Sequence, residues 1–191
     1  LSATERDSLL TLPDSKDDLI RYYSFSESDL AIIYQRREPA NRLGFAMQLC
    51  YMRYPGLILG VNDEPFAPLL RMVAAQLTVP VESWNDYGQR EQTRREHMVE
   101  LQTVFGLQPF TTMNHYRSAV RSLDELAWQS DKGIVLATSP VVSLRQKGVL
   151  LPTLDVIERI CAEAVTRANR RIYAALSDSL LPAHRQRLDD L

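Results

Sequence analysis

Hydrophobic residues along the chain recur at spacings of three and four positions, whereas the strict alternation typical of half-buried strands is scarce. That spacing places apolar side chains on one face of an α-helix. Bounded by Pro, Gly and capping residues, the pattern predicts an all-α fold. The expected helices cover residues 4–12, 15–23, 26–34, 40–53, 68–77, a long stretch within 83–105, 112–129, 134–146, 154–176 and a segment from 184 onward.

Three of these segments carry further information. The segment 40–53 is apolar on nearly every side, which predicts a helix buried among others. The segment 154–176 has one apolar face and one charged face. Pro140 lies inside 134–146 and is expected either to kink that helix or to begin a new one.

The helical pattern is interrupted near residues 107–112 by Gly106, Pro109 and two threonines. We therefore expect two consecutive helical domains, 1–108 and 109–191. Two segments have the shape of a helix-turn-helix. They are 29–53 and, as the better example, 139–176.

Composition indicates an ordinary globular chain. Of 191 residues, 45% are hydrophobic and 24% charged, and no apolar run approaches the roughly 20 residues of a membrane span. The first five residues resemble neither a signal nor a transit peptide. Cys50 and Cys161 lie in apolar helical patterns, far from zinc-ligand spacing, so we expect free thiols in a reducing cytoplasm.

The charge distribution favours a nucleic-acid partner more than the net charge of −2 does. Residues 1–30 hold seven acidic and only three basic residues, which leaves the remainder with 19 bases against 17 acids. Short clusters of cations create a local field for phosphates. Thirteen bases fall in such clusters: Arg36, Arg37, Arg42, Arg90, Arg94, Arg95, Arg117, Arg121, Arg145, Lys147, Arg167, Arg170 and Arg171.

Within the helix expected in 83–105, one face changes from apolar to cationic toward the N-terminus, where it passes through Arg94. Such a helix can be directed end-first at a groove or a phosphate. The alternative is that Arg94 forms an internal ion pair and that Glu91 and Arg95 are an ordinary surface pair.

The two helix-turn-helix segments supply further candidates for DNA contact. Arg and Asn, the residue types that recognise guanine and adenine edges, gather at the start of the helix 40–53. In 154–176, Asp155–Arg159 and Glu163–Arg167 can pair at i to i+4. Arg145, Lys147, Arg170 and Arg171 have no such neighbours and fit phosphate contacts better.

Enzyme chemistry has little support. The three histidines are far apart in sequence, and no phosphate-binding glycine loop, zinc motif or acidic triad for two-metal catalysis stands out. We expect no catalytic residue and no metal site.

Three ordered strings resemble the Tn-three family of bacterial replicative transposases. The first is Arg36-Arg37 followed by residues 41–56, the second is residues 90–97, and the third is 151–159 with 162–164 and 166–173. The resemblance implies an N-terminal region that binds the terminal inverted repeats of a mobile element as double-stranded DNA. It also implies that the acidic triad and its divalent metal lie in a separate RNase H-like domain, so this part needs no cofactor and does not cut.

The residues that the resemblance carries over as DNA contacts include base-reading and structural members without distinguishing them. They are Arg36, Arg37, Asn41, Arg42, Arg90, Arg94, Arg95, His97, Arg167, Arg170 and Arg171. Positions expected in the core are Leu43, Phe45, Leu49, Cys50 and Tyr54.

Two other functions remain open at this point. The domains can serve as an assembly module that mediates self-association or contact with another protein, for which the acidic residues 1–30 are suited. The second alternative is a metal-dependent nuclease, which lacks a matching constellation of residues.

Overall fold

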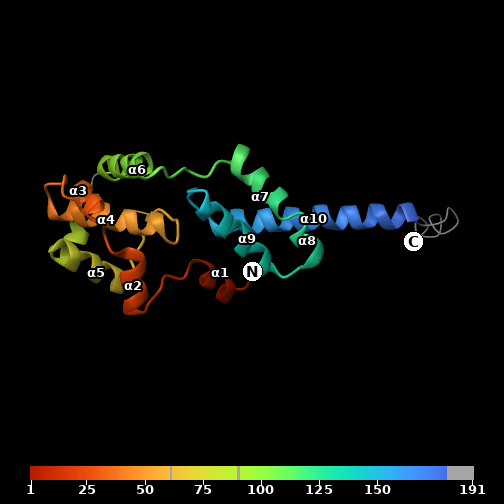
Figure 1. The fold of residues 1–191 in the computed structure, drawn as a ribbon, viewed down its shortest axis with the longest axis horizontal. Coiled ribbons are helices and arrows are strands. Elements are labelled where there is room, and N and C mark those ends of the chain that lie inside the picture. The colour runs from red at the N-terminus through yellow and green to blue at the C-terminus, as the bar shows by residue number, and fades with distance from the viewer. Residues whose placement is uncertain (61, 90, 180–191) are drawn as a thin grey trace. The chain divides into compact units, whose positions relative to one another are not determined.

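The computed structural model describes residues 1–60, 62–89 and 91–179. Within these ranges the regular structure is helical, apart from one isolated parallel bridge between Gln108 and Val149, which confirms the all-α prediction. The chain forms two compact units. We call residues 10–109 with 144–151 the α4 unit, and residues 1–9 and 110–143 with those described from 152 onward the α10 unit (Figure 1).

The helices of the α4 unit begin where the sequence supplies caps. Ser15 accepts a hydrogen bond from Asp18 N at 3.2 Å, and Ser26 with Asp29 completes a capping box. The helices are α2 (Lys16–Tyr23), α3 (Glu27–Ile33), α4 (Pro39–Arg53), α5 (Ala67–Leu77), the 3₁₀ helix η1 (Val81–Asp86) and α6 (Glu91–Phe105).

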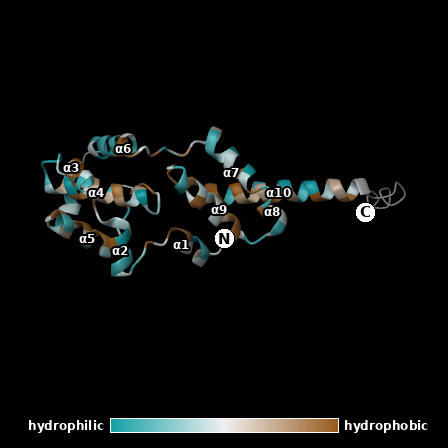
Figure 2. Cartoon of the chain, in the orientation of Figure 1, coloured by the Kyte–Doolittle hydropathy of each residue, from teal (hydrophilic) through white to brown (hydrophobic). Residues whose placement is uncertain are grey.

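Helix α4 forms the centre of this unit. Every residue from Leu43 to Met52 is buried, as its apolar surface predicts, and Figure 2 shows hydrophobic positions on α4 and α5. The buried polar side chain in this run, Gln48, pairs with the backbone of Leu59 through two hydrogen bonds of 3.0 and 3.1 Å. These bonds satisfy both ends of its amide and fix the loop that follows α4.

A segment distant in sequence completes the α4 unit. Leu150 N donates to Gln108 O at 2.8 Å, Gln108 N donates to Gly148 O at 2.8 Å, and Leu151 N donates to Gly56 O at 2.7 Å. Leu150 also joins the hydrophobic core around α4. Residues 144–151 therefore belong to this unit although they follow the predicted boundary near 107–112.

The α10 unit contains shorter helices and one long one. They are α1 (Ala3–Leu10), the π-helix η2 (Thr112–Tyr116), α7 (Arg117–Ser122), α8 (Leu126–Gln129), α9 (Gly133–Gln146, whose last residues count with the α4 unit) and α10 (Leu154–Ser179). Helices α7 and α8 lie against α10, which continues past them (Figure 1).

The core of the α10 unit uses the apolar face predicted for 154–176. Ile157, Ile160, Cys161, Ala164 and Ala168 are buried. Arg6 of α1 binds the carboxylate of Glu158 and also Asp155, which ties the first helix to the start of α10.

Several expected elements differ in detail. The helix within 83–105 begins only at Glu91, because η1 and a turn precede it. The stretch 112–129 is not one helix but three pieces, since a turn at 123–125 separates α7 from α8. Helix α9 runs through Pro140 as one element, and the expected helix from 184 lies outside the described residues. The assignment of DNA-binding domains to 1–108 and 109–191, and the helix-turn-helix elements, stay predictions.

Candidate nucleic-acid interface

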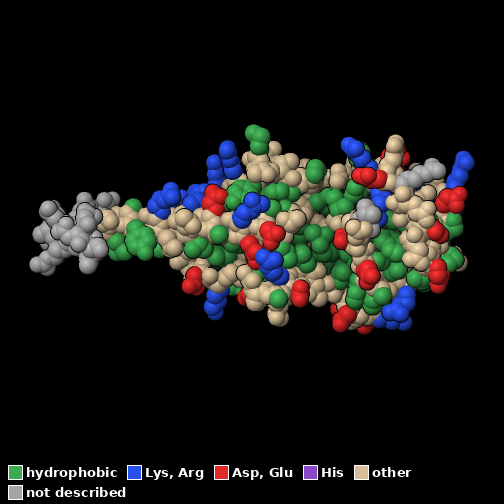
Figure 3. All heavy atoms as spheres, turned by 180° about the vertical axis from the view of Figure 1, so that it is seen from behind, with side chains coloured by type: hydrophobic (Ala, Val, Ile, Leu, Met, Phe, Trp, Pro, Cys, Tyr) green, Lys and Arg blue, Asp and Glu red, His purple; other side chains and the backbone are tan. Residues whose placement is uncertain are grey.

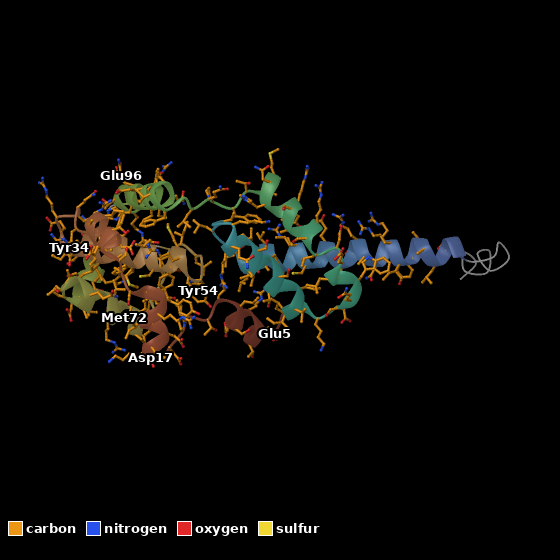
Figure 4. The ribbon with its side chains drawn as sticks, in the orientation of Figure 1. Glu5, Asp17, Tyr34, Tyr54, Met72 and Glu96 are labelled. Carbon is orange, nitrogen blue, oxygen red and sulfur yellow. The ribbon has the colours of Figure 1, made fainter. Side chains whose placement is uncertain are left out.

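The first cluster of candidate residues lies between α3 and α4. The side chain of Arg36 is only 11% exposed, binds the carboxylate of Glu100 on α6, and places its guanidinium 4.0 Å from the centre of the Phe45 ring. Arg42 donates from Nε to Arg36 O at 2.7 Å and lies 5.5 Å from the ring of Tyr34, which Figure 4 labels. Both arginines therefore stabilise the junction of α3, α4 and α6.

Two members of this cluster are more open. Arg37 is exposed, and Asn41 in the first turn of α4 is half-buried. They lie at the start of α4, where DNA contacts are expected. Because the rest of α4 is largely buried, only its first turn can make such a contact.

Helix α6 points its predicted contacts in opposite directions. Arg94 is buried, at 6% exposure, and donates from Nη2 to Leu59 O at 2.8 Å and Gly60 O at 2.7 Å. Arg95 is exposed, as is Glu96, which Figure 4 labels. Arg90 lies outside the described residues. Arg94 is thus internal, as the alternative interpretation had it, but its partners are carbonyl oxygens rather than a carboxylate.

His97 is buried beside Arg94 in a cluster of rings. Its Nδ1 lies 3.2 Å from the hydroxyl of Tyr87, whose ring stacks on the imidazole, and its edge meets Phe45. Burial, aided by the charge of Arg36, lowers the pKa of His97 from 6.5 to about 4. The ring is therefore neutral at pH 7 and supplies no positive charge for phosphate.

Gly44 lies in the middle of α4 and in the first of the three strings that resemble the transposase family. A Cβ at Gly44 would lie 2.0 Å from the ring of Tyr87. The ring thus packs directly on the backbone of α4, which brings Tyr87 within reach of His97. Tyr87 thus contacts both Gly44 of the first string and His97 of the second string.

Arg145 is held by contacts within the protein whereas Lys147 is exposed, as with Arg94 and Arg95. Arg145 donates from Nε to Pro55 O at 2.6 Å, and its guanidinium lies 4.8 Å from the ring of Tyr54, labelled in Figure 4. Burial lowers the pKa of Arg145. Lys147 is exposed. The partners of Arg145 come from 90 residues away in sequence, so sequence spacing could not reveal them.

On α10, the partners of the charged residues come from other elements rather than from i to i+4 neighbours. Asp155 binds Arg6, and Glu163 accepts a hydrogen bond from the hydroxyl of Tyr116 at 2.9 Å. Arg167 and Arg171 both bind Asp124, whereas Arg170 is exposed. The expected pairs Asp155–Arg159 and Glu163–Arg167 are therefore replaced by tertiary contacts.

Among the described residues, exposed cations gather on α7 and the second half of α10. Residues 164–177 contain three arginines and no acidic residue, and α7 contains two more arginines and no acidic residue. Arg117 and Arg121 of α7 are exposed. We call Arg117, Arg121, Arg167, Arg170 and Arg171 the α7–α10 arginine surface. Figure 3 shows Lys and Arg side chains along this part of α10.

The sequence shows Arg117 and Arg121 as a basic cluster, and their i to i+4 spacing places them on one side of a helix. The resemblance assigns no DNA contact to either residue. Nothing in the sequence indicates that Asp124 binds Arg167 and Arg171, because these contacts depend on the packing of α7 against α10.

Two features of the described residues concern metal binding and membrane insertion. Among residues 1–60, 62–89 and 91–179, no group of three or more His, Cys, Asp or Glu side chains is placed to hold a metal ion. In the same part of the chain, no helix has the length and apolar character needed to cross a membrane.

Comparison with known proteins places the chain in a family. Residues 1–164 match the model of a family described as a domain of unknown function, DUF4158. The chain belongs to the DUF4158 family.

Transposases are among the proteins that contain a similar sequence. Over 191 residues this DUF4158 chain is 70% identical to the transposase for transposon Tn3926 and 68% identical to the transposase for transposon Tn21, both of Escherichia coli. It is 54% identical to the transposase for transposon Tn501 of Pseudomonas aeruginosa. Each match covers 100% of this chain and 19% of the transposase, which confirms the resemblance stated from the three strings.

Proposed function

We propose that this DUF4158 chain binds double-stranded DNA at the terminal inverted repeats of a transposon, as the N-terminal part of a replicative transposase. The observation that carries the proposal is similarity to transposases along the whole chain, up to 70% identity over 191 residues. The chain spans 19% of those proteins, and in this proposal the remainder carries out cutting and joining. This part binds ends without breaking them and needs no cofactor.

The α7–α10 arginine surface supports a phosphate-binding role. Arginine forms bidentate hydrogen bonds with phosphate oxygens and keeps its charge at all physiological pH values. Exposed Arg117, Arg121, Arg170 and Arg171 give this surface an excess of positive charge although the whole chain carries −2. Phosphate contacts of this kind position a protein on a duplex without selecting a sequence.

Sequence selection needs side chains that can enter a groove. Arg37 and Asn41 at the start of α4, Arg95 on α6 and Lys147 are the predicted contacts of the α4 unit that remain exposed or half-buried. In this proposal they supply base or backbone contacts, while Arg36, Arg94 and His97 maintain the fold that carries them. Engagement of both units with one duplex raises the affinity, because the second contact becomes intramolecular.

The test is a salt titration of the 191-residue chain with two labelled duplexes of equal length. One carries the terminal repeat of the transposon that encodes the protein, and the other a scrambled sequence. We expect tighter binding of the repeat at every salt concentration, and a logarithmic salt slope that becomes steeper by about 0.9 for each phosphate contacted. Arg170→Gln should make the slope shallower by about one unit. Arg71→Gln, an exposed position on α5, should leave it unchanged.

Equal, weak binding of both duplexes would contradict end recognition and favour an assembly module. The acidic residues 1–30, with seven acidic against three basic side chains, are suited to such a module. Light scattering of the same samples would then detect self-association. Cleavage of either duplex in the presence of Mg²⁺ would contradict the assignment of a binding role alone.

A further inference from the structure

Asp124, in the turn after α7, holds two arginines of α10 through one oxygen atom. Its Oδ2 accepts hydrogen bonds from Nη2 of Arg167 at 3.2 Å and from Nη2 of Arg171 at 3.1 Å. The other carboxylate oxygen, Oδ1, is buried and has no hydrogen-bond partner among the described residues. One carboxylate oxygen therefore accepts hydrogen bonds from two arginines, while the other accepts none from the described residues.

This carboxylate lies among the arginines of α7 and α10, with Glu125 beside it in the same turn. The residues from 164 to 177 on α10 and those of α7 carry five arginines and no acidic residue. Glu163, at the edge of this stretch, accepts a hydrogen bond from Tyr116. Asp124 therefore neutralises one positive charge within the α7–α10 arginine surface.

The contact with Asp124 is of a kind that is easily exchanged. The side chains of Asp124, Arg167 and Arg171 are 21%, 34% and 50% exposed, and ion pairs open to solvent hold weakly. The buried oxygen without a donor has lost its hydration with no compensating hydrogen bond, which makes the paired state less favourable still. A phosphate, by contrast, offers several oxygens to the five N–H groups of each guanidinium.

We propose that Asp124 competes with DNA phosphates for Arg167 and Arg171, and so limits the affinity of this chain for duplexes of any sequence. The proposal rests on the DNA-binding function proposed above. In the free protein the carboxylate occupies both guanidinium groups. When a duplex binds, a phosphate replaces the carboxylate at one of them, and Asp124 keeps the other from a second phosphate contact.

The experiment compares Asp124→Asn with the matched control Asp131→Asn in the 191-residue chain. Asp131 is an exposed residue of the same unit, so both variants remove one negative charge. With the scrambled duplex at about 0.1 M salt, Asp124→Asn should bind about eightfold more tightly than the wild type, the gain expected from one additional phosphate contact. The logarithmic salt slope should steepen by about 0.9, and Asp131→Asn should change neither quantity by a comparable amount.

Further variants show where the gain comes from. Arg167→Gln with Arg171→Gln should abolish the effect of Asp124→Asn, because no cation is then released. Helical circular dichroism verifies the fold of each variant, and Asp124→Ala provides a second test if the asparagine variant folds poorly. Equal effects of Asp124→Asn and Asp131→Asn would overturn the proposal, because net charge alone would explain them. Weaker binding by Asp124→Asn would also overturn it, since Asp124 would then orient the arginines rather than compete for them.

The readout separates this inference from the proposed function. Equal binding of repeat and scrambled duplexes would contradict end recognition, but the Asp124 comparison would remain decisive on the scrambled duplex. If neither duplex binds, elution from a heparin column provides the polyanion test. Later elution of Asp124→Asn than of Asp131→Asn would support competition for anions, and coincident elution would refute it.

Discussion

Arg94 uses one nitrogen of its guanidinium to bind two backbone carbonyls of the loop after α4. Nη2 lies 2.8 Å from Leu59 O and 2.7 Å from Gly60 O, and the side chain is buried against the ring of Tyr87. A buried charge held in this way stabilises the fold, because without it two backbone carbonyl oxygens lose their donor.

We therefore expect Arg94→Gln to reduce the free energy of unfolding by about 2–3 kcal/mol, the cost of losing hydrogen bonds from a charged donor in a buried site. Arg95→Gln, the exposed neighbour, should change it by less than about 0.5 kcal/mol. Urea denaturation followed by circular dichroism measures both. If Arg94→Gln instead retains full stability and weakens DNA binding more than Arg95→Gln does, Arg94 acts at the interface.

His97 makes the stability of the α4 unit depend on pH. Its pKa in the folded chain, about 4, lies below the ordinary value of 6.5, so the unfolded chain takes up a proton in this interval that the folded chain does not. The free energy of unfolding should therefore fall as the pH is lowered from 6.5 to 4. The expected loss is about 2 kcal/mol, after allowance for solvent screening.

Thermal unfolding across this pH range, for the wild type and for His97→Gln, tests the assignment. The variant is less stable at pH 7 because it loses the ring contacts with Tyr87 and Phe45. Its stability should nevertheless depend less on pH between 6.5 and 4. An identical pH dependence in both proteins would show that His97 is not the group responsible.

At the scale of elements, the contact between α4 and the segment that leads into α6 depends on Gly44. Alanine at an ordinary interior helix position is more stable than glycine by about 1 kcal/mol. At Gly44 the added Cβ would meet the Tyr87 ring at 2.0 Å, so the ring and the segment that carries it must move.

Gly44→Ala should thus destabilise the chain by about 1–3 kcal/mol, the usual cost of overpacking, with a sign opposite to helix propensity. In a Tyr87→Leu background the same change should cost less, because the obstructing ring is gone. Chemical denaturation of the two single variants and the double variant gives the coupling energy. Simple additivity of the two changes would contradict direct packing of Tyr87 on Gly44.

At the scale of the whole molecule, folding gathers arginines on one surface and brings segments that are distant in sequence into the same unit. The net charge of −2 conceals a surface on α7 and α10 that is rich in arginine. Residues 1–9 count with the α10 unit and residues 144–151 with the α4 unit, so each unit combines segments from both sides of the predicted boundary. A boundary drawn from Gly and Pro finds the interruption in the helices but does not detect segments that cross it.

The sequence by itself determined the helical class, most helix positions, the burial of α4, the apolar face of α10 and the relation to transposases. These follow from local periodicity, capping residues and ordered strings, all of which are present in consecutive residues. Only the tertiary structure decided which basic side chains make contacts within the protein and which stay exposed. Arg36, Arg94, Arg145 and Arg167 each bind an acceptor that is distant in sequence. These acceptors lie between 34 and 90 residues away: Glu100 for Arg36, Leu59 and Gly60 for Arg94, Pro55 for Arg145 and Asp124 for Arg167. A guanidinium is equally suited to a carbonyl, a carboxylate or a phosphate.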